Sequence, residues 1–206
     1  MVRQPLQLFY ITDRAQLKSP LEEKIAQAMD AGVDWIQIRE KDLTARQLLA
    51  LAERAVAKAR HAGSTRVVVN DRIDVALAAS AHGVHLTTRS LPIAEVRRIV
   101  PEGFLIGKSC HSLADAEAAE STGADYILLG PIFPTPSKLP YGPPLGVSIL
   151  GEVASKVSIP VFALGGITFE NAAECREHGA AGIAGIRLFQ DADSISDLVR
   201  LIREHS

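Results

Sequence analysis

The sequence contains few aromatic residues, few cysteines and little net charge. Aromatic side chains make up 5% of the 206 residues, and 22 basic and 24 acidic residues give a formal charge of −2. This balance provides no bulk attraction for nucleic acid or anionic lipid, so neither is expected as a partner, although a local basic pocket stays open. The two cysteines, Cys110 and Cys175, form no CxxC pair and are too few for a disulfide framework.

Long hydrophobic runs are also missing. No apolar stretch approaches the roughly 20 residues that span a bilayer, and residues 1–7 contain no signal-peptide core. We therefore expect a cytoplasmic protein without a membrane segment. The chain does contain material for a core, because 47% of its residues are hydrophobic and 22% are charged. Such a composition is typical of a folded globular protein.

Short apolar runs alternate with amphipathic segments along the whole chain. The predicted strands are 9–11, 33–38, 67–69, 83–86, 104–106, 126–129, 161–164 and 182–186. The predicted helices are 20–31, 44–61, 71–81, 92–100, 112–121, 148–156, 168–178 and 194–204. Gly32 ends the first helix and Thr44 caps the second, as these residue types commonly do. The run Val67-Val68-Val69 is typical of a parallel strand that is buried on both faces.

Eight strand–helix pairs predict a (β/α)8 TIM barrel of the α/β class. The length is near the lower limit for this fold. An open, doubly wound sheet is the alternative, but such sheets seldom use eight uninterrupted parallel strands, and no G-x-G-x-x-G opens the first helix. The proline-rich stretch after residue 129 lies inside one strand–helix pair. We therefore expect a single domain over residues 1–206.

Cations follow many of the predicted strands. A barrel of this kind gathers the carboxyl ends of its strands at one face, where the active site lies. The cations are Arg39, Lys41, Arg89, Lys108, Lys138 and Arg187. Any one alone would be explained as a solvated surface residue, but cations after so many different strands predict an anion pocket. Gly165 and Gly166 lead into a helix, where backbone N–H groups commonly bind phosphate.

Three polar residues near the strand ends are further candidates. Asp71 can cap the helix that follows it, or it can bind Mg2+ together with diphosphate oxygens. Asn70, at a strand end, can hydrogen-bond a heterocyclic ring or a phosphate. His111 follows the fifth strand and can act as a general acid or base. By contrast, His85 lies inside a strand and is expected to be a packed core residue, and Cys110 a buried thiol.

Six motifs follow one another between Tyr10 and Phe189. They are Gln37-Ile38-Arg39-Glu40-Lys41, Asn70-Asp71-Arg72-Ile73-Asp74-Val75-Ala76-Leu77-Ala78, Gly83-Val84-His85-Leu86, Ser109-Cys110-His111-Ser112, Gly130-Pro131-Ile132-Phe133-Pro134-Thr135-Pro136-Ser137-Lys138 and Leu164-Gly165-Gly166-Ile167. In this order they resemble the superfamily of thiamine phosphate synthase and thiazole tautomerase. The similarity covers nearly the whole chain, and six motifs in register are specific to the superfamily.

The resemblance implies a transferase that joins 4-amino-2-methyl-5-hydroxymethylpyrimidine diphosphate to 4-methyl-5-(2-phosphoethyl)thiazole and releases diphosphate. The residues implied to hold the pyrimidine diphosphate are Gln37, Arg39, Lys41, Asn70, Ser109 and Lys138. Those implied to hold the thiazole phosphate are Thr135, Ser137, Gly166, Ile186 and Arg187. The resemblance assigns catalysis to Arg39, Lys41, Ser109 and Lys138. It also implies Mg2+ as the cofactor, with Asp71 as its ligand.

Three positions depart from the family pattern. Ser90 stands where the family has the Asp that is its second Mg2+ ligand, Cys110 replaces the usual Thr, and Arg187 replaces the usual Ser. The weaker metal site keeps a thiazole tautomerase open, with His111 as its proton shuttle, and a non-catalytic phosphoheterocycle-binding protein is a third alternative. The synthase is favoured because the residues implied to hold diphosphate are all present. The outer helix faces do not distinguish a monomer from a homodimer.

Overall fold

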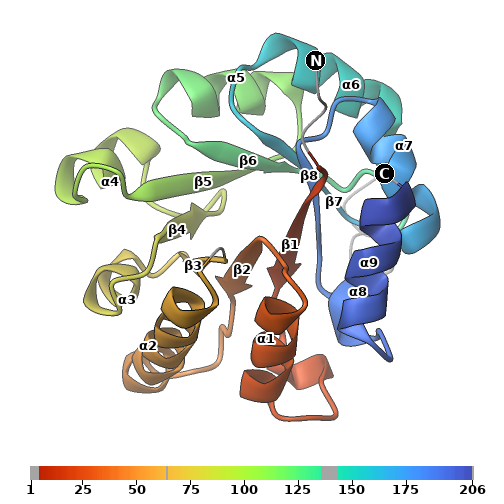
Figure 1. Ribbon diagram of the computed structural model, residues 1–206. Helices are drawn as coiled ribbons and strands as arrows, with labels where there is room; N and C mark the ends of the chain where they lie inside the picture. Colours follow the sequence, from red (N-terminus) through yellow and green to blue (C-terminus); the bar gives the residue numbers. More distant parts are fainter. Residues whose placement is uncertain (1–4, 64, 136–142, 206) are drawn as a thin grey trace.

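The computed structural model describes residues 5–63, 65–135 and 143–205. Within these ranges eight strands form a closed parallel barrel in sequence order, because each strand pairs with the next and β1 pairs with β8. The strands are β1 (Gln7–Ile11), β2 (Trp35–Ile38), β3 (Arg66–Asn70), β4 (Gly83–Leu86), β5 (Leu105–Cys110), β6 (Tyr126–Leu129), β7 (Val161–Leu164) and β8 (Gly182–Gly185). The predicted (β/α)8 barrel is confirmed (Figure 1).

Helices surround the barrel in Figure 1. They are η1 (Arg14–Gln16), α1 (Leu21–Asp30), α2 (Ala45–Ala62), α3 (Ile73–Ala78), α4 (Ile93–Ile99), α5 (Leu113–Ser121), α6 (Gly146–Lys156), α7 (Phe169–Glu177), α8 (Arg187–Gln190) and α9 (Ile195–His205). The eight predicted helices are all present, and the short η1 and α8 are additional. In the described ranges, none of these helices combines the length and the apolar character that a membrane span requires.

The end of β5 and the start of α3 differ from the prediction. Strand β5 continues to Cys110, because Lys108 and Ser109 pair with β6. Helix α3 begins only at Ile73. Of the two roles left open for Asp71, the helix cap is therefore excluded, because Arg72 is the N-cap. Asp71 directly follows the last residue of β3 and has a positive φ of 63°, a backbone conformation that Asp tolerates better than most residues.

The eighth strand also ends one residue earlier than predicted, at Gly185. Ile186 then serves as the N-cap of α8, and Arg187 is the first residue of that helix. The chain therefore turns sharply at the point where the sequence predicts that strand eight runs into Arg187. This turn places both residues on the face of the barrel that carries the strand ends.

Aromatic side chains fill the barrel interior. Phe9 stacks on Trp35 with ring centroids 5.4 Å apart, and both contact Tyr126 and Phe162. Alternate residues of each strand point inward, and these rings from β1, β2, β6 and β7 contact one another in the interior. Space for Tyr126 comes from Gly107 of β5, where a Cβ atom would overlap the Tyr126 ring.

The opposite faces of the strands pack against the helices. Val67 and Val69 belong to this outer core, whereas Val68 belongs to the interior cluster. The β-branched run of β3 is therefore buried on both faces, as predicted. Two closed apolar layers of this kind hold the strands in place and fix the positions from which the next residues project at the carboxyl ends.

Candidate active site

Polar side chains replace the apolar interior near the carboxyl ends of β2 to β5. Gln37 Nε2 donates a 2.9 Å hydrogen bond to Asn70 Oδ1. On the next strand, β4, His85 pairs with Asn70. The Nε2 atom of His85 is 2.9 Å from Ser109 Oγ on β5. The structure thus brings Gln37, Asn70 and Ser109, three residues implied to hold the pyrimidine diphosphate, into one polar layer.

Two atoms of this layer have no hydrogen-bond partner among the described residues. They are Gln37 Oε1 and His85 Nδ1, and both residues are almost fully buried. Buried polar atoms nearly always have a partner in native proteins. The unpaired Gln37 oxygen is therefore an acceptor that a bound ring can use.

The burial expected for His85 is confirmed, but its contact with Ser109 was not predicted. Burial, followed by the nearby Lys108 charge, lowers the pKa of His85 to about 3. The imidazole is therefore neutral at pH 7, and it orients the Ser109 hydroxyl without adding charge. The inward alternation of Gly83 and His85 on β4 was the sequence signal for this placement.

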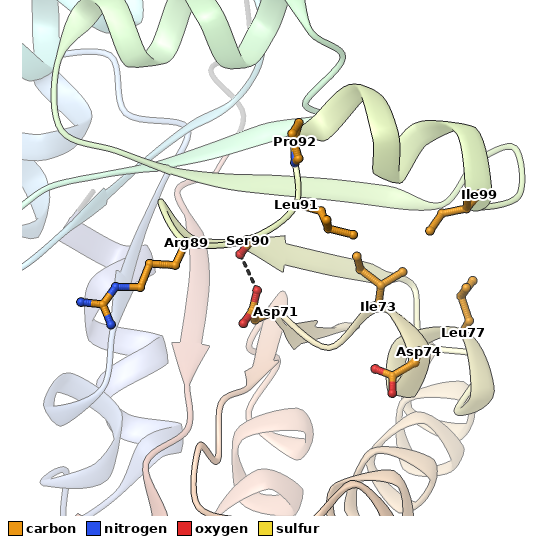
Figure 2. A pocket seen from close by; sticks show the side chains of 9 residues that line it. All are labelled: Asp71, Ile73, Asp74, Leu77, Arg89, Ser90, Leu91, Pro92 and Ile99. Carbon is orange, nitrogen blue, oxygen red and sulfur yellow. Dashed lines mark hydrogen bonds between the residues drawn. The ribbon is translucent and has the colours of Figure 1, made fainter.

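Asp71 and Ser90 lie together where the resemblance implies a metal site (Figure 2). Ser90 Oγ donates to Asp71 Oδ1 at 2.5 Å and accepts from Thr87 N at 2.7 Å. No group of three or more His, Cys, Asp or Glu side chains within the described ranges could hold a metal ion. One carboxylate with a neighbouring hydroxyl still fits Mg2+, which is commonly held by one or two carboxylates together with substrate phosphates and waters.

A groove of about 650 Å³ extends from this pair between α3 and α4. Its side walls are mostly apolar and include Ile73, Leu77, Leu91, Pro92 and Ile99. In Figure 2 the Arg89 side chain points away from these apolar residues. The polar end of the groove, at Asp71 and Ser90, is therefore the part suited to a metal–anion complex.

The predicted ring of cations is only partly supported. Arg39 directly follows β2, is partly exposed, and has its Nη1 atom 4.0 Å from Asp13 Oδ2. Lys41 is also exposed after the same strand. Lys108 differs, because its side chain lies on the outer face of β5, the face that packs against the helices. Its Nζ atom donates to the Thr87 carbonyl at 2.6 Å. Lys108 therefore fastens the loop after β4, which carries Ser90.

The loops after β6 and β7 are packed together. Gly166 has a positive φ of 66°, and a Cβ atom there would lie 2.6 Å from the Pro134 carbonyl oxygen. Phe133 N donates to the Gly165 carbonyl at 3.0 Å. The segment leading to Thr135 is thus held against the Gly165-Gly166 turn, as binding of one phosphate by both would require.

The remaining predicted residues have varied placements. Lys138 and Ser137 lie outside the described residues. Arg187 is exposed at the start of α8. His111 Nδ1 is 2.5 Å from the Gly130 carbonyl oxygen. Cys110 is fully buried and burial raises the pKa of its thiol to about 12, which agrees with an unreactive core thiol.

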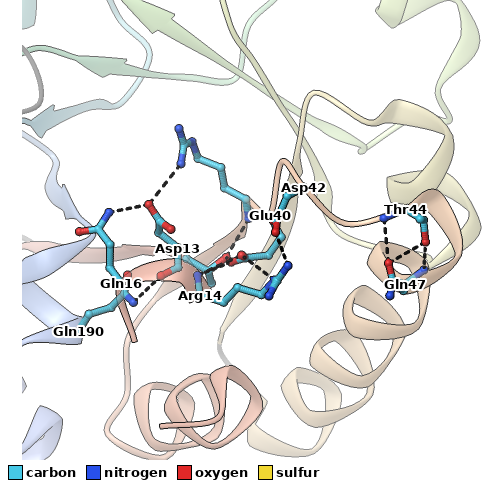
Figure 3. Close-up of polar contacts among 10 residues, drawn as sticks. Asp13, Arg14, Gln16, Glu40, Asp42, Thr44, Gln47 and Gln190 are labelled. Carbon is cyan, nitrogen blue, oxygen red and sulfur yellow. Dashed lines mark hydrogen bonds and ion pairs between the residues drawn. The ribbon is translucent and has the colours of Figure 1, made fainter. Parts of the chain in front are cut away.

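Two buried residues near Arg39, Thr12 and Glu40, were not recognised from the sequence as candidate site residues. The Thr12 hydroxyl donates to Glu40 Oε1 at 2.6 Å. The Arg14 backbone N–H donates to the same carboxylate, and Figure 3 shows Arg14 beside Glu40. Burial raises the pKa of Glu40, while these hydrogen bonds oppose the shift. The position of Glu40 between Arg39 and Lys41 was the only signal in the sequence, since its partners lie 26 and 28 residues away.

A closed (β/α)8 barrel with polar and cationic residues at its strand ends has the architecture of a barrel enzyme, whose active site lies at that face. A family model described as thiamine monophosphate synthase matches residues 8–189. The chain belongs to this thiamine monophosphate synthase family, whose members are transferases.

Relatives and a solved structure agree with this assignment. The chain is 45% identical over 185 residues to a putative thiamine-phosphate synthase of Geobacter sulfurreducens, covering 89% of this chain and 86% of the relative. It is 41% identical over 198 residues to the thiamine-phosphate synthase of Methanoculleus marisnigri, covering 96% and 93%. The structure of thiamine phosphate pyrophosphorylase from Pyrococcus furiosus superposes with a TM-score of 0.88 at 35% identity, covering 97% and 94%.

Proposed function

We propose that this protein condenses 4-amino-2-methyl-5-hydroxymethylpyrimidine diphosphate with 4-methyl-5-(2-phosphoethyl)thiazole to form thiamine phosphate and diphosphate. Family membership supports the reaction. The observation that carries the assignment to this site is the polar layer of Gln37, Asn70 and Ser109, beside Arg39 and the Asp71–Ser90 pair. Ring-binding and anion-binding groups thus occur at one end of the barrel.

The reaction needs no side-chain base to activate the nucleophile. The thiazole nitrogen carries a lone pair and forms the new C–N bond to the pyrimidine methylene, while the C–O bond to diphosphate breaks. The barrier then depends on how well the departing negative charge is stabilised. Arg39, Lys41 and Lys138 are proposed to bind this charge, and the neutral Ser109–His85 pair is proposed to orient the ring without opposing positive charge on the methylene.

The unpaired acceptor of Gln37 suits the amino group of the pyrimidine. Gln37 Nε2 is already bonded to Asn70, which fixes the amide so that Oε1 is free to accept. A substrate N–H donor would satisfy this buried oxygen, and an analogue without the amino group would leave it unpaired at a cost of about 1–3 kcal/mol. Recognition of the amino group is therefore proposed to be strong.

Mg2+ is proposed to bind at Asp71, with Ser90 as a neutral neighbour. When bound, Mg2+ would neutralise charge on the diphosphate oxygens. Asp71 would hold the metal-bound anion near the end of β3, next to Asn70. The oxygen donors present fit this hard cation, as described above.

The thiazole phosphate is proposed to bind on the opposite side of the barrel mouth. Thr135, Ser137, the Gly166 backbone, Ile186 and Arg187 are the proposed contacts. The Gly166 turn packs against the segment that leads to Thr135, and Arg187 adds a cation at the start of α8. Membership of a biosynthetic enzyme family supports the proposal that the reaction takes place in the cytoplasm.

The test is incubation of the protein with both heterocyclic phosphates and Mg2+. Equal amounts of thiamine phosphate and diphosphate are expected, and neither should form when one substrate is omitted. Isomerisation of a thiazole carboxylate phosphate without diphosphate release would instead select the tautomerase with His111 as its proton shuttle. Binding without any product would select the non-catalytic alternative.

A further inference from the structure

The carboxylate of Glu40 is buried against the loop after β1, although both neighbours in the sequence are cations proposed to bind diphosphate. Glu40 is only 5% exposed. A buried carboxylate is costly unless donors surround it. Its donors come from the loop after β1: the Thr12 hydroxyl at 2.6 Å, and the Arg14 backbone N–H at 3.2 Å and 3.0 Å from the two oxygens.

Thr12 links this carboxylate to Arg39. Its hydroxyl has one proton, which it donates to Glu40, so its oxygen is left to accept from the Arg39 backbone N–H at 2.9 Å. Thr12 is fully buried. Its own backbone N–H donates to the Gln37 carbonyl at 2.9 Å. The hydroxyl therefore has a fixed direction, and the chain entering and leaving Arg39 is held by the loop after β1.

The same loop provides the counter-charge of the Arg39 guanidinium. Asp13 Oδ2 lies 4.0 Å from Arg39 Nη1 and accepts from Gln16 Nε2 at 2.6 Å. Gln190 of α8 donates to the Asp13 carbonyl at 2.8 Å, which ties the loop to the helix that follows β8 (Figure 3). A carboxylate at this distance orients the guanidinium but leaves donors for a second anion.

We infer that Thr12 and Glu40 are positioning residues: the chain from Glu40 through Thr12 to the Arg39 backbone fixes Arg39 for binding the diphosphate group. This inference rests on the role proposed above for Arg39. Neither Thr12 nor Glu40 touches the substrate. Their substitution changes anion affinity through Arg39 and leaves the binding of the thiazole phosphate unaffected.

Thr12→Val tests the link, because it keeps the shape of the side chain and removes the hydroxyl. The Kd of inorganic diphosphate, measured by calorimetry in the presence of Mg2+, is expected to rise about tenfold or more, the effect of losing a hydrogen bond to a charged group. Thr12→Ser retains the hydroxyl and should restore tight binding. Glu40→Gln is a second variant and should raise the Kd in the same direction, since its amide N–H group would face the Arg14 N–H donor.

Thr44→Val is the matched control. Thr44 lies in the same β2–α2 connection and caps α2 with Gln47, and Figure 3 shows it apart from Glu40. The variant should lower the melting temperature, because a helix cap is lost, and leave the Kd of diphosphate unchanged. A purely structural role of Thr12 predicts the same behaviour for Thr12→Val, so that result would overturn the inference.

A double-mutant cycle with Arg39→Ala separates this inference from the proposed function. If Thr12 acts through Arg39, Thr12→Val has no further effect on the diphosphate Kd once Arg39 is absent. Additive effects of the two substitutions would contradict the inference while leaving the role of Arg39 intact. An unchanged Kd in Arg39→Ala alone would remove the proposed role of Arg39, and the inference with it.

Discussion

Ser90 donates a hydrogen bond to Asp71, and this contact joins the end of β3 to the loop after β4. The pair consists of one carboxylate and one hydroxyl, so a single negative charge faces the polar end of the groove. Lys108 holds the Thr87 carbonyl of the same loop. The charge at the proposed metal site is therefore set by Asp71, and hydrogen bonds within the protein hold the loop that carries Ser90.

A second carboxylate at position 90 should strengthen Mg2+ binding. In Ser90→Asp the Mg2+ concentration for half-maximal rate is expected to fall about tenfold, because two carboxylates bind a hard cation better than one. Mg2+ titration of the initial rate measures this. Ser121→Asp adds the same charge at an exposed position at the end of α5 and should leave the Mg2+ concentration for half-maximal rate unchanged. An identical Mg2+ response in Ser90→Asp and the wild type would argue against a metal at this pair.

The buried His85 should make the fold sensitive to acid. Its pKa is about 3 in the folded protein and ordinarily 6.5, so between these values the unfolded chain binds a proton that the folded protein does not. The free energy of unfolding therefore falls as the pH falls below 6.5, with a contribution of about 1.4 kcal/mol per pH unit. Urea titrations of His85→Gln at pH 4 to 7 should show a shallower pH dependence.

His61→Gln is the control for this experiment, because His61 is exposed on α2. It should retain the steep pH dependence of the wild type. Equal slopes for His85→Gln and the wild type would show that His85 does not carry the proton uptake that its burial predicts.

Substitution of Gly166 should affect the thiazole phosphate more than the pyrimidine diphosphate. Gly166→Ala forces a side chain into a positive-φ position, where a Cβ atom would meet the Pro134 carbonyl at 2.6 Å. The KM for the thiazole phosphate is expected to rise, and stability to fall by about 1–3 kcal/mol. Steady-state kinetics with each substrate varied in turn measures the difference.

Gly63→Ala separates backbone strain from the effect on the site. Gly63 is the C-cap of α2 and also has a positive φ, but a Cβ atom added there would meet no other atom within 4 Å. The variant should lose stability without a change in either KM. If the KM for the thiazole phosphate were the same in Gly166→Ala and Gly63→Ala, the proposed binding of this phosphate at the Gly166 turn would be contradicted.

Much of the fold follows from local sequence patterns. The β-branched run of β3 and the Thr44 cap of α2 are signals within a few residues, and the structure confirms both. The end of β5 could not be predicted in this way, because Lys108 and Ser109 belong to the strand through their pairing with the neighbouring strands β4 and β6. Parallel pairing brings together residues far apart in the chain, and the short local run 104–106 contains no sign of it.

The site shows the same division. Asn70 follows from the rule that strand ends meet at one face of a barrel, whereas Gln37 and Ser109 were implied by the family resemblance. The contact between Thr12 and Glu40 spans 28 residues and depends on the register of β1 and β2, so neither residue stood out in the sequence. The outward direction of the Lys108 side chain could likewise not be predicted, because it depends on the extension of β5 to Cys110.

The central claim is that Arg39 stabilises the departing diphosphate, and a single-turnover measurement tests it most directly. With both substrates saturating, the rate constant for diphosphate release in Arg39→Ala is expected to fall at least about a hundredfold, the effect of removing one preorganised charge-stabilising donor. Arg98→Ala, which removes an exposed cation of α4 paired with Glu95, should keep the wild-type rate. An undiminished rate constant in folded Arg39→Ala would contradict this role.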